Sequence, residues 1–405
     1  MQLKSPSKNR FRKEQVTAFA LLLNTLSWYF IGYLMIEKIG SAFDEASVES
    51  LCLRLIYPFF IITSAIACSV FLGKVRRVRF FYLWLLFGIA LALCAALPLG
   101  SSFWLMLVLV GVLGVSLGVG TPLCFGYFAE SVSIENRGKV GGFILFGTVL
   151  SAPVAFLVMS PLDLASSALF LALWRAWSLP FLLLDSDKRQ YELSSEKLPS
   201  LASVLRDRTF YLYFTAWLMF ALVDSFEGRI VDVAIGDFRF FIRVIEPTIA
   251  AFSAIIGGLL SDWVGRKRVL VFGFVSLGIA YATIGLFSQV WFSWFFYFVI
   301  DGVALGLLWT LFVIVLWGDM SEKGSAKFYA IGEAPFFLTR ILSELLAPYM
   351  ILIPESSSFS LAAFFLFLAV LPLLIVPETL PEKKMKDREL KTYLDKAKKI
   401  KEKYT

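Results

Sequence analysis

Charged residues lie inside strongly apolar stretches of this 405-residue chain. A charge in a membrane-like interior is costly, so each of them is a candidate for function. The set has five carboxylates and two arginines: Arg175, Asp224, Glu227, Asp301, Glu333, Arg340 and Glu344. Because an unpaired carboxylate in such surroundings must bind a proton, a metal cation or a cationic substrate, the excess of acids predicts ion-coupling chemistry. H⁺ and Na⁺ are the coupling ions that we expect.

Two pairs of these charges share a helical face, because three or four residues make one helical turn. The pairs are Asp224 with Glu227 and Arg340 with Glu344. Arg340 and Glu344 could therefore simply neutralise one another. Glu227 and Glu246 could lie close enough to the outer surface to be hydrated.

Asp301 and Arg175 have different surroundings in the sequence. Asp301 is the one charged residue of its apolar run, so we expect an isolated carboxylate in a low-dielectric pocket, the environment that a proton carrier requires. Arg175 is flanked by Trp174 and Trp177. Cation–π packing on a supporting helix is therefore an alternative to a substrate contact for Arg175.

The composition requires elements that cross a membrane. Hydrophobic residues make up 59% of the chain and the mean hydropathy is +0.77, whereas a soluble domain is about 45–50% apolar. A chain of 405 residues holds about twelve spans of roughly 20 residues and little else. We therefore expect an all-α polytopic membrane protein, with spans near 15–36, 51–72, 80–99, 103–127, 140–159, 164–184, 209–231, 240–261, 269–287, 291–317, 328–351 and 357–376.

The distribution of cations predicts the topology. Lys and Arg occur in alternate loops, and the loops near 100–102, 160–163, 288–290 and 352–356 have neither. Since cytoplasmic loops carry the excess of Lys and Arg, both termini are expected in the cytoplasm, with the chain in the plasma membrane. The net charge of +7 is explained by this pattern, and nucleic-acid binding is not expected.

The chain also divides into two similar parts. The long polar interval 185–208 predicts a cytoplasmic linker between a half at 1–184 and a half at 209–376. A shift of about 190 residues lays Arg76 over Arg266 and Glu130 over Asp319 or its neighbour. The charged tail, 377–405, predicts either a basic amphipathic helix on the membrane surface or a solvated helix.

The segment 257–268, Gly-Gly-Leu-Leu-Ser-Asp-Trp-Val-Gly-Arg-Lys-Arg, is a very short loop between two apolar runs. Its first glycines allow a neighbouring backbone to approach, and its acid can meet a helix N-terminus or an arginine. The segment resembles the Gly-x-Leu-x-Asp-Arg-x-Gly-Arg-Lys loop of the major facilitator superfamily of secondary transporters, with Trp263 in place of the first arginine. The residues that carry the resemblance are Gly258, Asp262, Gly265, Arg266 and Lys267.

Two further segments extend the resemblance over the whole chain. Glu130 followed by Arg137 and Gly138 is similar to the Glu…Arg-Gly signature after the fourth span, and Glu378 stands in a Pro-Glu-Thr ending. The charges of the first segment could pair with each other or with neighbouring loops. The family implies that these charges, with Asp319, form a cytoplasmic gate between the halves, to which Glu333 could also belong. The loop at 73–79 keeps the cations but lacks the aspartate and the second glycine.

The resemblance implies two six-helix halves related by a pseudo-two-fold axis, with a substrate path between them and transport by alternating access. In this family the seventh and tenth spans line the cavity, so Asp301 ranks first and Asp224 second as ion-coupling residues. Six residues of predicted cavity-lining spans could bind a sugar or another organic solute, or could serve packing: Asn24, Trp28, Tyr29, Tyr33, Trp217 and Trp309. The fifth span lacks the glycine-rich run typical of drug antiporters, which favours a symporter or a uniporter.

Several classes of function are excluded or disfavoured. The chain has no histidine, which excludes a histidine proton relay and a histidine-ligated metal. We find no nucleophile motif, metal-ligand spacing, phosphate-binding glycine loop or channel filter, so we expect neither an enzyme nor a bound cofactor. The expected partners are a small-molecule substrate, a coupling H⁺ or Na⁺ and the lipid bilayer, with the chain as a monomer. A facilitative uniporter and a non-transporting receptor or scaffold remain alternatives.

Overall fold

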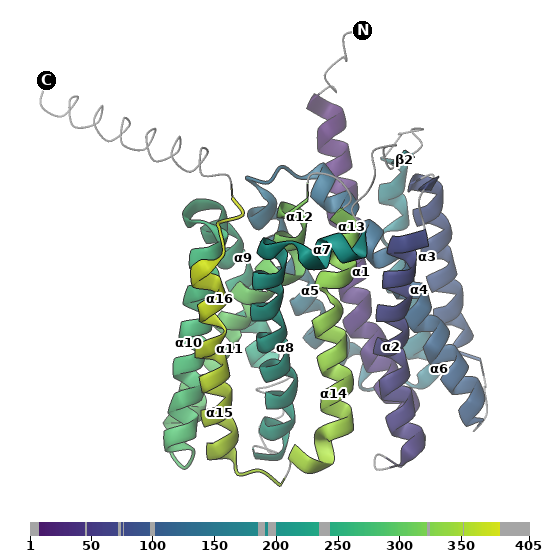
Figure 1. Cartoon of the computed structure of the whole chain (residues 1–405). Helices are drawn as coiled ribbons and strands as arrows, with labels where there is room; N and C mark the ends of the chain where they lie inside the picture. Colours follow the sequence, from purple (N-terminus) through teal and green to yellow (C-terminus); the bar gives the residue numbers. More distant parts are fainter. Residues whose placement is uncertain are drawn as a thin grey trace, which may run out of the picture.

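Long apolar helices dominate the computed structural model, because a chain in lipid must satisfy every backbone N–H and C=O group internally. The structure describes residues 8–44, 47–71, 74–75, 77–97, 102–184, 191–192, 200–234, 244–321, 325–350 and 352–380. The start of the first helix and the end of the last helix lie on the same side, at the top of Figure 1, which we call the terminal face. The opposite side is the far face.

The N-terminal half consists of six helices that run between the two faces (Figure 1). A 3₁₀ segment, η1 (Leu179–Leu183), continues the sixth helix, and strand β1 (Lys74–Val75) pairs antiparallel with β2 (Tyr191–Glu192). The helices are α1 (Lys8–Gly40), α2 (Val48–Phe71), α3 (Arg77–Cys94), α4 (Phe103–Ser131), α5 (Arg137–Met159) and α6 (Leu164–Ala176).

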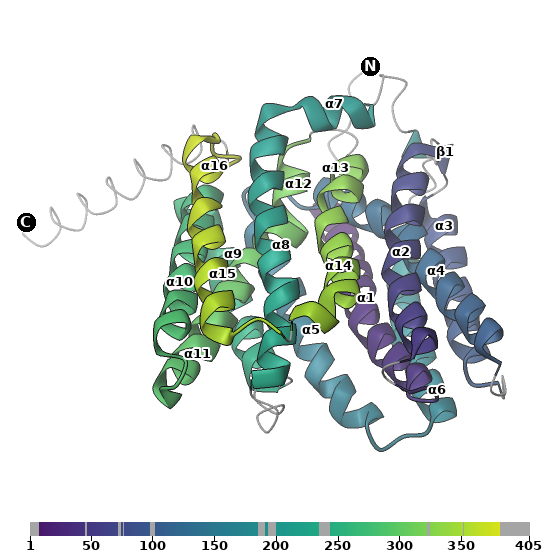
Figure 2. The same ribbon diagram turned by 60° about the horizontal axis from the view of Figure 1, so that its bottom comes forward.

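The C-terminal half begins after α7 (Leu201–Arg206), a short helix that lies across the terminal face (Figure 2). Its first three long helices are α8 (Arg208–Ala234), α9 (Glu246–Val264) and α10 (Arg266–Phe287). The fourth is α11 (Trp291–Trp309), which continues through the π-helical segment η4 (Thr310–Val315) into α12 (Leu316–Asp319). The last two are each in two pieces, α13 (Ser325–Gly332) with α14 (Ala334–Met350), and α15 (Glu355–Leu368) with α16 (Val370–Ile375).

Ten helical segments in the described part of the chain are long and apolar enough to cross a membrane. The shorter α3 and the interrupted pair α13–α14 occupy the positions of the two other predicted spans. The predicted all-α polytopic fold of two six-helix halves is therefore confirmed. Most of the predicted linker, and the charged tail beyond residue 380, lie outside the described residues.

Two spans of the C-terminal half are irregular where the sequence predicts continuous helices. One irregularity is η4, directly after Trp309. The other is the break at Glu333, where Pro335 has no N–H to donate to the carbonyl group of Ile331. Irregular backbone inside a membrane protein is found where it is buried or lines a cavity, so both positions point toward a site.

The two halves pack backbone to backbone along α5 and α9. A Cβ atom on Gly258 would collide with the carbonyl oxygen of Gly138, and a Cβ atom on Gly142 would lie 2.5 Å from the carbonyl oxygen of Ala254. Small residues let helices in lipid approach this closely. The close approach predicted at Gly258 is thus confirmed. Helices α2 and α14 form a second contact between the halves.

Candidate functional site

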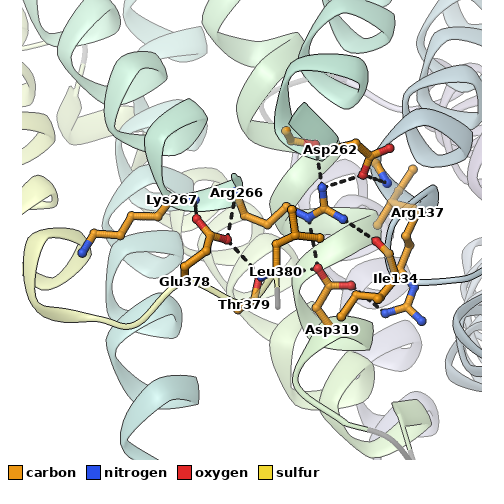
Figure 3. A network of polar contacts seen from close by, with 12 residues as sticks. Ile134, Arg137, Asp262, Arg266, Lys267, Asp319, Glu378, Thr379 and Leu380 are labelled. Carbon is orange, nitrogen blue, oxygen red and sulfur yellow. Dashed lines mark hydrogen bonds and ion pairs between the residues drawn. The ribbon is translucent and has the colours of Figure 1, made fainter. Parts of the chain in front are cut away.

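The carboxylate of Asp262, at the end of α9, binds the N-terminus of α5 in the other half (Figure 3). Its oxygens accept hydrogen bonds from the backbone N–H groups of Gly138 at 3.0 Å and Lys139 at 2.6 Å. A helix N-terminus favours a negative charge. A Cβ atom on Gly138 would lie only 2.6 Å from the Asp262 carboxylate, so glycine is required for this contact.

A buried chain of alternating charges extends from Asp262 across the terminal face (Figure 3). Arg266 contacts Asp262 at 2.6 Å and Asp319 at 3.1 Å, and Arg137 of the other half contacts Asp319 at 2.6 Å. Arg266 also donates a hydrogen bond to the carbonyl oxygen of Ile134 at 2.7 Å. Each charge has an opposite partner, which makes its burial tolerable. We call Arg137, Gly138, Asp262, Arg266 and Asp319, with the carbonyl group of Ile134, the terminal gate.

Glu378 and Lys267 act within the C-terminal half. The Glu378 carboxylate accepts the backbone N–H groups of Arg266 at 2.9 Å and Lys267 at 3.0 Å, at the N-terminus of α10. Gly265, before this helix, has φ of 101°, a conformation that favours glycine. The Lys267 ammonium donates to the carbonyl oxygens of Leu374 and Val376. These residues shape the loop that presents Asp262 and do not themselves bridge the halves.

Two sequence expectations at the terminal gate are now resolved. Arg137 forms its ion pair with Asp319 of the neighbouring half, and Glu130 is exposed at the end of α4. Trp263, in place of the family's arginine, is 80% exposed.

A second network joins the halves nearer the far face. Glu344 of α14 contacts Arg54 of α2 at 3.1 Å and accepts a hydrogen bond from the Tyr33 hydroxyl of α1 at 3.3 Å. Arg340 donates to the same hydroxyl oxygen at 2.8 Å, and its Nε lies 3.9 Å from Glu344. The expected contact between Arg340 and Glu344 is present, but both residues also bind the other half. We call these four residues the far gate.

Arg54 was not among the residues selected from the sequence. It lies in the predicted second span, four residues after Ser50, whose hydroxyl accepts a hydrogen bond from its guanidinium at 3.1 Å. The available signal was an arginine inside an apolar run, the same signal that identified Arg175.

A small cavity of about 50 Å³ lies between the two gates. On α14 the lining residues Phe336 and Phe337 precede the far-gate residue Arg340 in the sequence. On α11 and η4 the lining residues Trp309 and Val313 precede the terminal-gate residue Asp319. Both halves contribute, and six of the side chains are aromatic. The lining residues are Thr25, Leu26, Tyr29, Phe30, Leu117, Thr121, Phe125, Leu145, Thr148, Trp309, Val313, Glu333, Phe336 and Phe337.

Glu333 is the charged residue of this lining, and it lies at the helix break between α13 and α14. Its carboxylate accepts a hydrogen bond from the indole N–H of Trp317 at 3.1 Å. The Trp317 ring packs against Gly332, where a Cβ atom would meet it at 2.5 Å. Membership of the terminal gate, the role considered from the sequence, is not observed for Glu333.

The acids ranked highest from the sequence lie outside this cavity lining. Asp301 shares side-chain hydrogen bonds with Glu246 and Tyr281, so the expectation of an isolated carboxylate was wrong. Glu246 is not a free hydrated acid but is bonded to Asp301. Asp224 lies within the electrostatic influence of Asp301 and of Arg340 in the far gate. These residues form one acidic cluster between α8, α9, α10 and α11.

Glu227, one helical turn from Asp224, accepts a hydrogen bond from the Tyr297 hydroxyl. Asp224 and Glu227 lie one turn apart on α8, as their spacing predicted, and Glu227 contacts α11. Within the described residues, no group of three or more acids or cysteines is close enough to hold a metal ion.

Arg175 is fully buried inside the N-terminal half. Its guanidinium lies 4.7 Å from the ring of Trp28 and 4.1 Å from that of Trp84, and it donates to the Asn24 side chain at 3.0 Å. The Asn24 amide in turn donates to the carbonyl oxygen of Trp174 at 2.7 Å. The cation–π alternative is thus observed, with tryptophans from α1 and α3 and not with the sequence neighbours. Neither Arg175 nor Asn24 lines the cavity.

The other aromatic candidates divide between three environments. Tyr29 and Trp309 line the cavity, and Trp309 stacks on Phe30 with ring centroids 5.9 Å apart. Tyr33 belongs to the far gate. Trp217 is a core residue that stacks on Phe312 at 5.0 Å. A predicted position in a cavity-lining span was therefore insufficient to identify a cavity residue.

Two six-helix halves that meet through one polar network on each side of a cavity define the architecture of a multi-pass membrane protein. The sequence model of the Major Facilitator Superfamily matches residues 241–402. The chain has the fold of the major facilitator superfamily, and its second half carries that family's sequence pattern.

Solved structures of that fold cover most of the chain. The human organic anion transporter MFSD10 (TETRAN) is 16% identical, with 91% of this chain and 100% of that chain covered and a TM-score of 0.65. The proton:xylose symporter XylE bound to 6-bromo-6-deoxy-D-glucose is 15% identical, with 90% and 96% covered and a TM-score of 0.69. A bacterial homologue of the iron transporter ferroportin in its outward-facing state is 13% identical, with 91% and 98% covered and a TM-score of 0.66. A sequence search of proteins with curated functions found no match.

Proposed function

We propose that the protein is a secondary transporter that moves a small organic solute across a membrane by alternating access. The observation that carries the proposal is the pair of gates, each built from both halves, with one cavity between them. Rocking of the halves about this cavity opens one gate while the other stays closed. The similar fold of the xylose symporter and of the organic anion transporter supports the same class of activity.

The terminal face is the cytoplasmic side in this proposal, and the membrane is the plasma membrane. Support comes from the cations around the terminal gate, which include Lys139, Arg266, Lys267 and Arg268. Loops rich in Lys and Arg remain in the cytoplasm during insertion.

Transport is coupled to an ion, H⁺ or Na⁺, through the acidic cluster. Asp301 and Glu246 share a hydrogen bond, and two carboxyl groups in such contact hold at least one proton between them. Loss of that proton makes the cluster more negative. The more negative cluster then attracts Arg340 more strongly, which draws Arg340 away from Glu344. The protonation of the cluster is thereby linked to the closure of the far gate.

Uptake of a broad panel of radiolabelled solutes into proteoliposomes, with and without an inwardly directed proton gradient, tests the proposal. Gradient-stimulated uptake of one solute class is expected, with protein-free liposomes as the control. Uptake that does not depend on a proton or Na⁺ gradient would favour the facilitative uniporter. Absence of uptake for every solute would contradict transport and favour the receptor or scaffold.

A further inference from the structure

The cavity combines an aromatic wall with one carboxylate. The six aromatic lining residues are Tyr29, Phe30, Phe125, Trp309, Phe336 and Phe337. Aromatic faces carry negative electrostatic potential and attract cations, most strongly where water is excluded. Among the charged side chains of the described residues, Glu333 is the one that lines the cavity. The lining therefore presents negative potential from its rings and a negative charge from its carboxylate, and no cationic group.

The Glu333 carboxylate has no cation partner among the described residues, and its hydrogen bond comes from the neutral indole of Trp317. Its side chain is only 8% exposed. The buried acids of the two gates, in contrast, are each matched by an arginine, as Asp319 is by Arg266. A buried ionised carboxylate without a partner is strongly unfavourable. Glu333 must therefore hold a proton or meet a cation that enters the cavity.

Two further polar groups of the lining have no partner within the described structure: the indole N–H of Trp309 and the hydroxyl of Thr148. Both atoms are buried behind the lining surface. A water molecule needs about 10–15 Å³ of cavity space. The cavity of about 50 Å³ thus suits a compact ligand of a few heavy atoms.

We propose that the cavity binds a small organic cation of the alkylammonium class, with Glu333 as its counter-ion and the aromatic side chains around its alkyl groups. The proposal deepens the transport function above and rests on it. It assigns the substrate a charge opposite to that named for the human organic anion transporter of similar fold. The Glu333 carboxylate would repel an organic anion in the same place.

Binding of three molecules of nearly the same shape to the purified full-length chain tests this proposal. Choline is the cation, 3,3-dimethylbutan-1-ol is its neutral isostere, and 3,3-dimethylbutanoate is the anion. Equilibrium binding to the detergent-solubilised protein is expected to favour choline over the alcohol by at least about tenfold, with no detectable binding of the anion. Equal affinity for choline and the alcohol, tighter binding of the anion, or no saturable binding of choline overturns the proposal.

Two substitutions test whether Glu333 and Phe337 produce the preference for choline over the alcohol. Glu333→Gln is expected to remove the preference for choline over the alcohol, and Glu355→Gln, a matched change at the start of α15, is expected to keep it. Phe337→Leu keeps an apolar side chain but removes the aromatic ring, so it should weaken choline binding by about fivefold more than binding of the alcohol. If Glu333→Gln does not fold, Phe337→Leu and the wild-type comparison still decide. An unchanged preference in both variants contradicts the proposal. Because these measurements need no transport, solute uptake without choline binding would refute the cation site alone.

Discussion

At the residue scale, Gly138 shows how one missing side chain permits a gate. Its N–H group binds Asp262, and any Cβ atom would meet that carboxylate, the Ser261 hydroxyl and the backbone of Gly258. The N-terminus of α5 can approach the other half this closely only because Gly138 has no side chain. A carboxylate then completes the contact at the end of the helix where it is favoured.

Gly138→Ala is therefore expected to destabilise the closed terminal gate by about 1–3 kcal/mol, the cost of forcing a methyl group into a close contact. Thermal unfolding of the purified protein measures this effect. Gly228→Ala is the control, because a Cβ atom there would meet nothing within 4 Å. Equal effects of the two substitutions would contradict the packing argument.

Substitution of Asp301 tests the ion-coupling role proposed for the acidic cluster. Asp301→Asn keeps the shape of the side chain but removes its ionisation, so ion-driven accumulation of the solute should be lost while counterflow remains. Asp163→Asn on the far face is the matched control. Hydrogen bonds from Ser166 hold the pKa of Asp163 below its ordinary value, and asparagine can replace it as a helix cap. Full accumulation by Asp301→Asn would refute its role.

At the element scale, the contacts between α5, α9 and α12 decide whether the halves stay together on the terminal side. Arg137 comes from α5, and Asp319 from the end of α12. Both are buried in a network that also contains Arg266, so each contact supports the next. The interruptions at η4 and at Glu333 lie in the two spans that reach from this gate to the cavity. These spans can bend where their hydrogen bonding is already irregular.

A double-mutant cycle measures the coupling between the halves directly. Arg137→Ala and Asp319→Ala should each weaken terminal-gate closure, and together they should cost less than the sum, with a coupling energy of about 0.5–3 kcal/mol. Thermal unfolding of the four proteins provides the free energies. Strict additivity would mean that the ion pair between α5 and α12 contributes nothing to closure.

At the scale of the whole molecule, apolar runs and loop cations were enough to predict the fold. The loop at 257–268 predicted the terminal gate because its partners are backbone groups and charges at helix ends, whose positions follow from the chain order. The cavity was harder to predict. Spans such as α4 and α5 are apolar on every side, so periodicity does not reveal which face a residue occupies. The rotation of each helix about its own axis decides which residues meet. It determines the pairing of Asp301 with Glu246, the pairing of Arg54 with Glu344 and the position of Glu333 in the cavity lining.

Access to the cavity from each side tests the alternating mechanism most directly. The reporter is Thr121→Cys, a residue of the cavity lining, in a chain whose four native cysteines are replaced by serine. A membrane-impermeant thiol reagent is applied separately to each face of oriented vesicles. Asp262→Asn, which weakens the terminal gate, should raise labelling from the terminal side and lower it from the far side, and Glu344→Gln should do the reverse. Labelling from one side in every variant, or labelling that rises on both sides together, would contradict the account.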